Sequence, residues 1–284
     1  MTGDELSLLQ FANRIGLNLF ALLTIGFALH AASGVVERDS LRGLRSRIAL
    51  TGAALSFFTA VRLGILVAQM GDGGNFLDPE LMPLAWLVLG DSSVAILAGA
   101  AASIGGVWFG SRIVAGLGAA ALSVGFGLTG HAQGLTDPGL APIMVAAHVL
   151  IAGFWVAAPI SLYPPDSTLD SARLTSRLHR FSTIAVAAIP VLIALGIWLA
   201  WILTEGGERL LGTTYGLLLL AKLAIGVIAI GVGLHNRQVI TAKVAADPPT
   251  GKKWLRFALL CEATLFAAAI IAVSAATTIG APAG

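Results

Sequence analysis

Met144 and His148 are the residues of this chain whose types and spacing best suit chemistry. They lie four residues apart in the apolar segment from Ala141 to Pro159, and this spacing puts a thioether and an imidazole on one face of a helix. His131 precedes the segment in a turn flanked by glycines. We therefore expect His131, Met144 and His148 to converge near one end of that helix.

A thioether and imidazoles together suit Cu(I) better than Mg²⁺, Ca²⁺ or Mn²⁺, which prefer oxygen ligands. Cys261 is the single cysteine, so an internal disulfide and a site with several cysteines are both excluded. The sequence contains no HExxH motif, phosphate-binding loop, Gly-x-Ser-x-Gly motif or paired catalytic carboxylates. We predict copper, Cu(I) above all, as the metal and expect no enzymatic activity.

The composition is that of a polytopic membrane protein. Of the 284 residues, 57% are hydrophobic and 11% are charged, whereas soluble domains carry about 25% charged residues. A helix needs roughly 20 apolar residues to cross the hydrocarbon, so the chain predicts one all-α membrane domain over residues 1–284 with about eight spans. The predicted spans are residues 8–32, 48–70, 84–109, 113–130, 140–162, 180–204, 214–236 and 254–279.

The positive charges predict how the spans are oriented. Of the 17 Lys and Arg residues, 13 lie in or beside alternate links between the spans, and these links are cytoplasmic by the positive-inside rule. Both termini are then periplasmic. Because the charge is concentrated in short loops, it gives no reason to predict nucleic-acid binding. The 13 residues are Arg38, Arg42, Arg45, Arg47, Arg112, Arg173, Arg177, Arg180, Arg237, Lys243, Lys252, Lys253 and Arg256.

One of the predicted spans contains a polar interruption. The run Gly90 to Ser93 breaks the apolar pattern, and an Asp or Ser there can cap a new helix. We therefore expect a short outer helix near residues 83–89, followed by the crossing helix.

Ionisable residues inside the spans require partners, because they are costly at membrane depth. Counting from the span centres puts Arg62, His148 and Lys222 in one layer of the outer half, with Asp91 further out as the natural counter-charge of Arg62 or Lys222. Together these residues are expected to shape a cavity or to form ion pairs.

Two further histidines lie at the cytoplasmic ends of their spans. His30 and His235 are interpreted either as solvated residues at helix ends or as a possible inner site. Glu262 lies in the inner half of the last span, and the sequence names no partner for it. Trp155, near His148, is expected to serve packing.

Several short segments resemble the CopD family of copper resistance membrane proteins, most strongly over residues 131–237. The segments are the Gly-His-Ala turn at 130–132, HVLIAGFW from His148 to Trp155, Arg180 to Ser182, Gly212 to Gly216, Leu219 to Leu223, and Asn236 with Arg237. Three places differ from the family pattern. Val145 stands where an acidic residue is frequent, Leu217 stands where Arg is common, and Val-Ala-Ala follows Trp155 where a segment with glycine is usual.

The resemblance implies a copper-handling protein of the bacterial inner membrane, which accepts copper from a periplasmic CopC-like carrier and moves it inward. A membrane redox protein with haem b or quinone is the alternative. In it His148 with another outer histidine, and His30 with His235, would form two axial pairs, and Arg14, Arg62 and Lys222 would face propionates or a quinone. A third interpretation is a scaffold subunit whose polar residues only pack, and the oligomeric state stays open.

The charge pattern yields a topology prediction. A reporter that is active only outside the cytoplasm should be active when fused after Gly284, because the positive-inside rule leaves both termini in the periplasm. A fusion between the first two predicted spans serves as the matched control and should be inactive. The opposite pair of activities would contradict the orientation and put His131 on the cytoplasmic side.

Overall fold

The structure is a computed structural model that describes residues 3–71, 74–129, 138–164, 171–204 and 207–279. Helices make up 89% of it. They are α1 (Gly3–Ala32), α2 (Leu41–Met70), α3 (Met82–Phe109), α4 (Arg112–Gly127), α5 (Ala141–Val156), α6 (Ala158–Ser161), α7 (Ser171–Leu203), α8 (Gly207–Gly212), α9 (Thr214–His235), α10 (Thr241–Ala246) and α11 (Pro248–Ile279), with a 3₁₀ turn η1 (Arg38–Ser40) and a π turn η2 (Asn236–Ile240).

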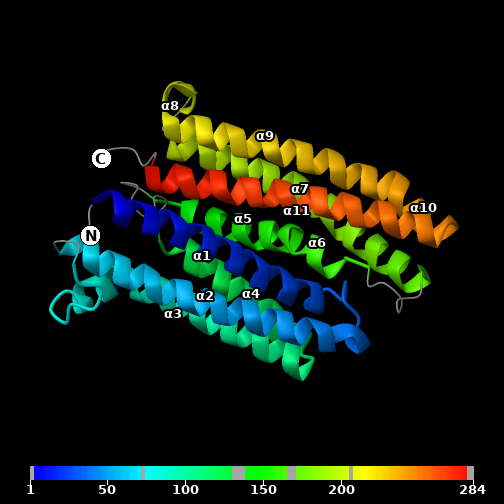
Figure 1. Cartoon of the computed structure of the whole chain (residues 1–284), viewed down its shortest axis with the longest axis horizontal. Helices are drawn as coiled ribbons and strands as arrows, with labels where there is room; N and C mark the ends of the chain where they lie inside the picture. Colours follow the sequence, from blue (N-terminus) through cyan, green and yellow to red (C-terminus); the bar gives the residue numbers. More distant parts are fainter. Residues whose placement is uncertain (1–2, 72–73, 130–137, 165–170, 205–206, 280–284) are drawn as a thin grey trace.

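The first and last helices lie side by side and run in opposite directions (Figure 1). The side chain of Arg14 donates to the carbonyl of Thr277, and Asn18 Nδ2 donates to Ser274 Oγ at 3.1 Å. The start of α1 and the end of α11 therefore lie at the same end of the bundle. We call this end, which also holds α8, the α8 end, and the opposite one the α10 end.

This arrangement requires an even number of crossings. Seven helical segments of the described chain are long and apolar enough to cross a membrane, and α4 is the shorter apolar helix between two of them. With 16 residues, α4 is about 24 Å long, against about 30 Å for the hydrocarbon core. With α4 the chain runs along the bundle eight times, and the predicted all-α membrane bundle is confirmed.

Glycines allow α3 and α4 to pack with their backbones nearly in contact. A Cβ atom on Gly106 would lie 2.3 Å from the backbone nitrogen of Ala115, and one on Gly99 would lie 2.3 Å from that of Leu122. Small residues at such positions are how membrane helices associate closely. The two contacts run in opposite order along the two helices, so α4 returns antiparallel to α3.

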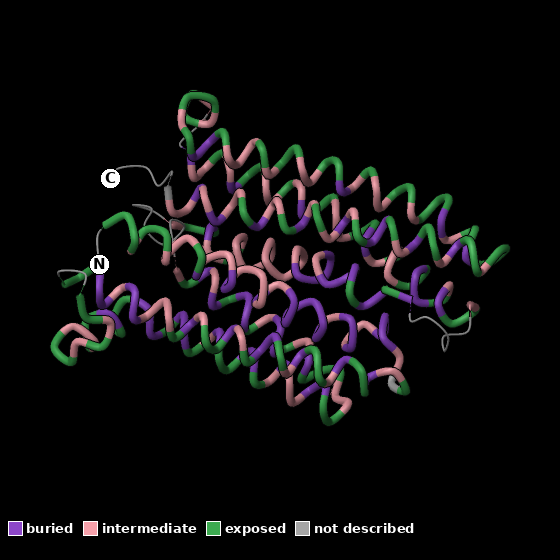
Figure 2. The backbone as a smooth tube through the Cα atoms, viewed as in Figure 1, coloured by how far each residue is buried: buried purple, intermediate pink, exposed green. Residues whose placement is uncertain are grey.

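Helix α1 is the most enclosed long helix, and Figure 2 shows its buried stretches near the middle of the bundle. Against α5 it packs through Gly26, where a Cβ atom would lie 2.1 Å from the carbonyl oxygen of Gly153. By contrast α9 exposes large apolar side chains such as Leu217, Val227 and Ile228. In a membrane protein such a surface faces lipid.

The short outer helix expected near residues 83–89 is wrong, because α3 continues without a break from Met82 to Phe109. The Ser92 hydroxyl does not cap a new helix but donates to the carbonyl of Gly125 on α4 at 2.8 Å. Gly90 lies under the side chain of Trp86 on the same helix. The polar run therefore serves helix packing.

The contact between α3 and α4 predicts different outcomes for two glycines of one helix. Gly99→Ala should destabilise the protein by about 1 to 3 kcal/mol, because the added methyl overlaps the α4 backbone. Gly105→Ala is the matched control, since nothing lies within 4 Å of its Cβ position, and it should be neutral or slightly stabilising. Thermal unfolding in detergent measures both, and equal behaviour would contradict the close approach.

Candidate functional site

His148 lies half-buried on α5 and faces α7. A Cβ atom on Gly196 of α7 would lie 3.3 Å from Cε1 of the imidazole. A larger residue at position 196 would therefore press on the ring. The glycine gives the imidazole its place between the two helices.

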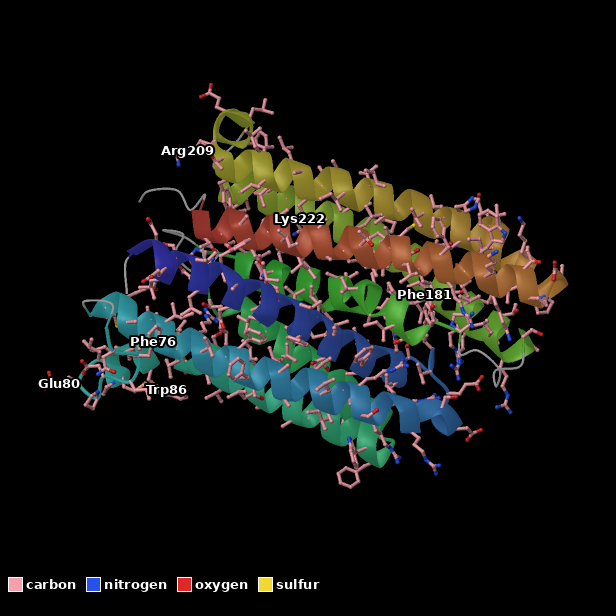
Figure 3. The ribbon with its side chains drawn as sticks, in the orientation of Figure 1. Phe76, Glu80, Trp86, Phe181, Arg209 and Lys222 are labelled. Carbon is pink, nitrogen blue, oxygen red and sulfur yellow. The ribbon has the colours of Figure 1, made fainter. Side chains whose placement is uncertain are left out.

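Lys222 of α9 reaches the same imidazole, with 3.5 Å between Lys222 Nζ and His148 Nε2. An ammonium group can only donate, so Nε2 acts as the acceptor and the ring proton is assigned to Nδ1. His148 Nδ1 is buried, and the imidazole lies close to the backbone of Leu192 on α7. Figure 3 places Lys222 along α9 in the half of the bundle nearer α8.

The face of α5 that carries His148 also carries Met144 and Trp155, which follow the helical spacing. Met144 is half-buried. The ring of Trp155 packs edge-to-face on Phe266 of α11, with 5.1 Å between ring centroids, and belongs to an apolar cluster that includes Leu192 of α7 and Ala229 of α9. The expected packing role of Trp155 is confirmed.

The three expected metal ligands are described in part. Met144 and His148 share one helix face, while His131 lies outside the described residues. Within the described part of the chain, no group of three or more His, Cys, Asp or Glu side chains could hold a metal ion. Of the three expected ligands, the described residues thus contain two, Met144 and His148.

The expected layer of charges divides into separate clusters. Arg62 Nη2 donates to Thr129 Oγ1 at 2.5 Å, and the positive charge of Arg14 lies near enough to act on Arg62. Asp91 is exposed and makes no ion pair with Arg62 or Lys222 in the structure. The proposed counter-charge is therefore wrong, because Asp91 lies on a face of α3 that is turned away from these residues.

The structure does not bring His30 and His235 together as an inner site. His30 is fully buried, its Nε2 donates to the carbonyl of Phe154 at 2.9 Å, and its ring packs edge-on against Phe154 and Phe181. His235 is exposed at the end of α9. His30 therefore supports packing between α1, α5 and α7, and the interpretation as a solvated residue fails for it.

The sequence could not name a partner for Glu262, and the structure supplies one. Glu262 on α11 is 3% exposed, and Asn236 Nδ2 donates to its Oε1 at 2.7 Å. Asn236 begins the π turn η2, which follows directly on α9. The only signal in the sequence was the pair Asn236 and Arg237 among the segments that resemble the family.

Helix α7 faces His148, α9 carries Lys222 and α11 carries Glu262, and these three helices lie in a stretch that matches a known family. Residues 176–276 match the CopD family, copper resistance protein D. The resemblance seen in the sequence is confirmed over this stretch. Neither the comparison with curated proteins nor that with solved structures found a match.

The residues around His148 come partly from the stretch that matches CopD and partly from the chain before it. Gly196, Lys222 and Glu262 lie inside the matched stretch, whereas Met144 and His148 precede it on α5. The seven long apolar segments indicate a multi-pass membrane protein, and its residues 176–276 match the copper resistance protein D family. The site joins that region to the preceding helix through the contact between His148 and Lys222.

The positive charge of Lys222 beside His148 predicts how Cu(I) affinity changes when that charge is removed. Lys222→Gln should tighten Cu(I) binding about tenfold or more, because a unit charge within a few ångströms contributes roughly 1 to 4 kcal/mol when partly screened. Lys243→Gln is the matched control, since Lys243 is exposed and lies over the ring of Trp254. Competition with a Cu(I) chelator measures both variants. Equal affinity of wild type and Lys222→Gln would contradict binding of copper near His148.

Proposed function

We propose that this protein binds Cu(I) between α5, α7 and α9 and moves it across the inner membrane. Met144 and His148 are the described donors, and His131 is the expected third. The observation that carries the proposal is the half-buried imidazole of His148, held against the CopD-matched helices by Gly196 and Lys222. An ionisable side chain at such depth is a functional site by default.

Lys222 suits a site through which copper passes. A positive charge 3.5 Å from the imidazole nitrogen repels a bound cation and lowers its affinity. A transport site must bind its ion well enough to admit it and weakly enough to release it. The same charge would be a disadvantage in a site that stores copper permanently.

The position of the site supports entry from the α8 end. Lys222 is the ninth residue of α9, and α9 begins beside α8 at that end. The sequence predicts the α8 end to be periplasmic, where a CopC-like carrier would deliver copper. The carrier and inward movement are proposals that rest on the family resemblance.

The haem alternative receives less support from the described residues. A haem with two axial histidines needs two imidazoles that face each other across one ring. His30 uses Nε2 on a backbone carbonyl, His235 is exposed, and His148 Nε2 faces Lys222. His131, outside the described residues, is the histidine left to complete a pair with His148.

Two substitutions on α5 test the copper site. His148→Ala and Met144→Leu should each weaken Cu(I) binding by about tenfold or more, because each removes one donor of a small soft set. Met144→Leu keeps the side-chain volume, so the helix should stay packed. His179→Ala is the control, since His179 is exposed on α7. The measurement is copper bound per purified protein, at matched abundance, under reducing conditions.

The same samples separate copper from haem. A protein with haem bound between two histidines would show a strong Soret absorption that His148→Ala abolishes and Met144→Leu leaves intact. Stoichiometric haem together with failure to retain supplied Cu(I) would replace the copper proposal with the redox one. Equal copper binding by His148→Ala and His179→Ala would remove His148 from the ligand set.

A further inference from the structure

Glu262 is a buried carboxyl group in the middle of a membrane-spanning helix. Its residue is 3% exposed, and Oε1 accepts a hydrogen bond of 2.7 Å from Asn236 Nδ2. Burying an ionised carboxylate costs far more than burying a neutral carboxyl group unless a cation is paired with it. The state of Glu262 therefore depends on the charges that surround it.

No positive side chain contacts Glu262 in the described part of the chain. On the elements packed against α11, and on α11 itself, each ionisable candidate is engaged or exposed. Arg14 donates to Thr277, His30 to Phe154, and Arg256 to the carbonyl of Pro164. Lys222 of α9 contacts His148, and Lys243 lies over Trp254. Lys252 lies near the start of α11, ten residues before Glu262, and Lys253, His235 and Arg237 are exposed. Asn236, which is neutral, is the polar partner that remains.

The amide oxygen of Asn236 lacks a hydrogen-bond donor, and a protonated Glu262 could supply one. Its Oδ1 is buried without a hydrogen-bond partner, although its Nδ2 is bonded to Glu262. A carboxylate only accepts hydrogen bonds, whereas a carboxylic acid also carries an O–H donor. The backbone is held here by the π turn, in which Thr241 Oγ1 donates to the carbonyl of Asn236 at 3.0 Å. Single π turns in helices are frequent at functional sites.

We propose that Glu262 and Asn236 form a proton-binding site in which Glu262 carries a proton at rest and releases it when a cation passes through the bundle. The coupling to copper rests on the proposed function, whereas the proton site itself does not. Two hard oxygen acceptors suit a proton and do not suit Cu(I), which prefers sulfur and nitrogen. The site is therefore distinct in chemistry from Met144 and His148.

The exchange balances in charge. The O–H bond of the Glu262 carboxyl breaks, the proton passes to water at the α10 end, and the carboxylate keeps the electron pair. One entering Cu⁺ then compensates the single negative charge left in the bundle. Return of a proton to Glu262 restores the neutral site after copper leaves.

Infrared spectroscopy of the purified protein tests the proton site without copper. The wild type at neutral pH should show the carbonyl stretch of a protonated carboxyl group, sensitive to exchange into D₂O. Glu262→Gln should lose this band, because the amide keeps the size and the hydrogen-bond acceptor but has no acidic proton. Glu208→Gln is the matched control, since Glu208 is exposed on α8, and should keep the band. A wild type without the band, or a band that survives in Glu262→Gln, would overturn the proposal.

Proteoliposomes that contain a pH-sensitive dye test the coupling. Cu(I) added to the wild type should produce a proton signal, and Glu262→Gln should lose at least about nine-tenths of it while binding as much copper as the wild type. An undiminished proton signal in Glu262→Gln would overturn the coupling. Failure of the copper proposal is seen separately, because His148→Ala would then bind copper normally while the carboxyl band still depended on Glu262.

Discussion

The backbone contact between α1 and α5 is the constraint on which the rest of the site depends. A Cβ atom on Gly26 would lie 2.1 Å from the carbonyl oxygen of Gly153, so neither helix can turn without a clash. Successive residues of a helix are about 100° apart, which puts His148 roughly 140° and Met144 roughly 180° around α5 from Gly153. Fixing one face of α5 on α1 therefore directs the other face to α7 and α9.

The bundle pairs its interior charged groups in small local sets. Arg14 and Arg62 donate to groups of α11 and of the segment after α4, Lys222 meets His148, and Asn236 meets Glu262. Each set joins different helices, and no described contact connects one set with another. Charged residues inside a membrane pair with one another or with backbone groups, and here each set makes its own pairing.

The CopD-matched helices and the helices before them contribute unequally. Helices α7 and α9 expose much apolar surface and make fewer tight contacts than α1, α3 and α4, whose glycines bring backbones together. The proposed copper site lies where the two groups meet, at α5. Such a boundary, between a closely packed part and a looser one, allows small movements around an ion without unfolding either part.

The sequence by itself determined the class of the protein, an all-α membrane bundle, and the position of each polar residue along its helix. Both follow from the lengths of the apolar runs and from the positions of residues along each run, which can be read directly from the linear sequence. Apolar length and charge spacing were enough to put His148 and Lys222 at one depth, and the structure brings them to 3.5 Å. Short motifs were enough to indicate the CopD family, which the match to residues 176–276 bears out.

Only the tertiary structure decided which side of each helix a residue occupies, because rotation about the helix axis is set by contacts with neighbouring helices. Asp91 has a suitable depth but faces outward. His30 lies near a helix end but is enclosed by Phe154 and Phe181. Glu262 accepts a hydrogen bond from Asn236, which the π turn positions, and no local sequence pattern predicted that turn. The position of a residue along its helix follows from the order of the residues. Which side chains it contacts depends on packing between segments that are far apart in the chain.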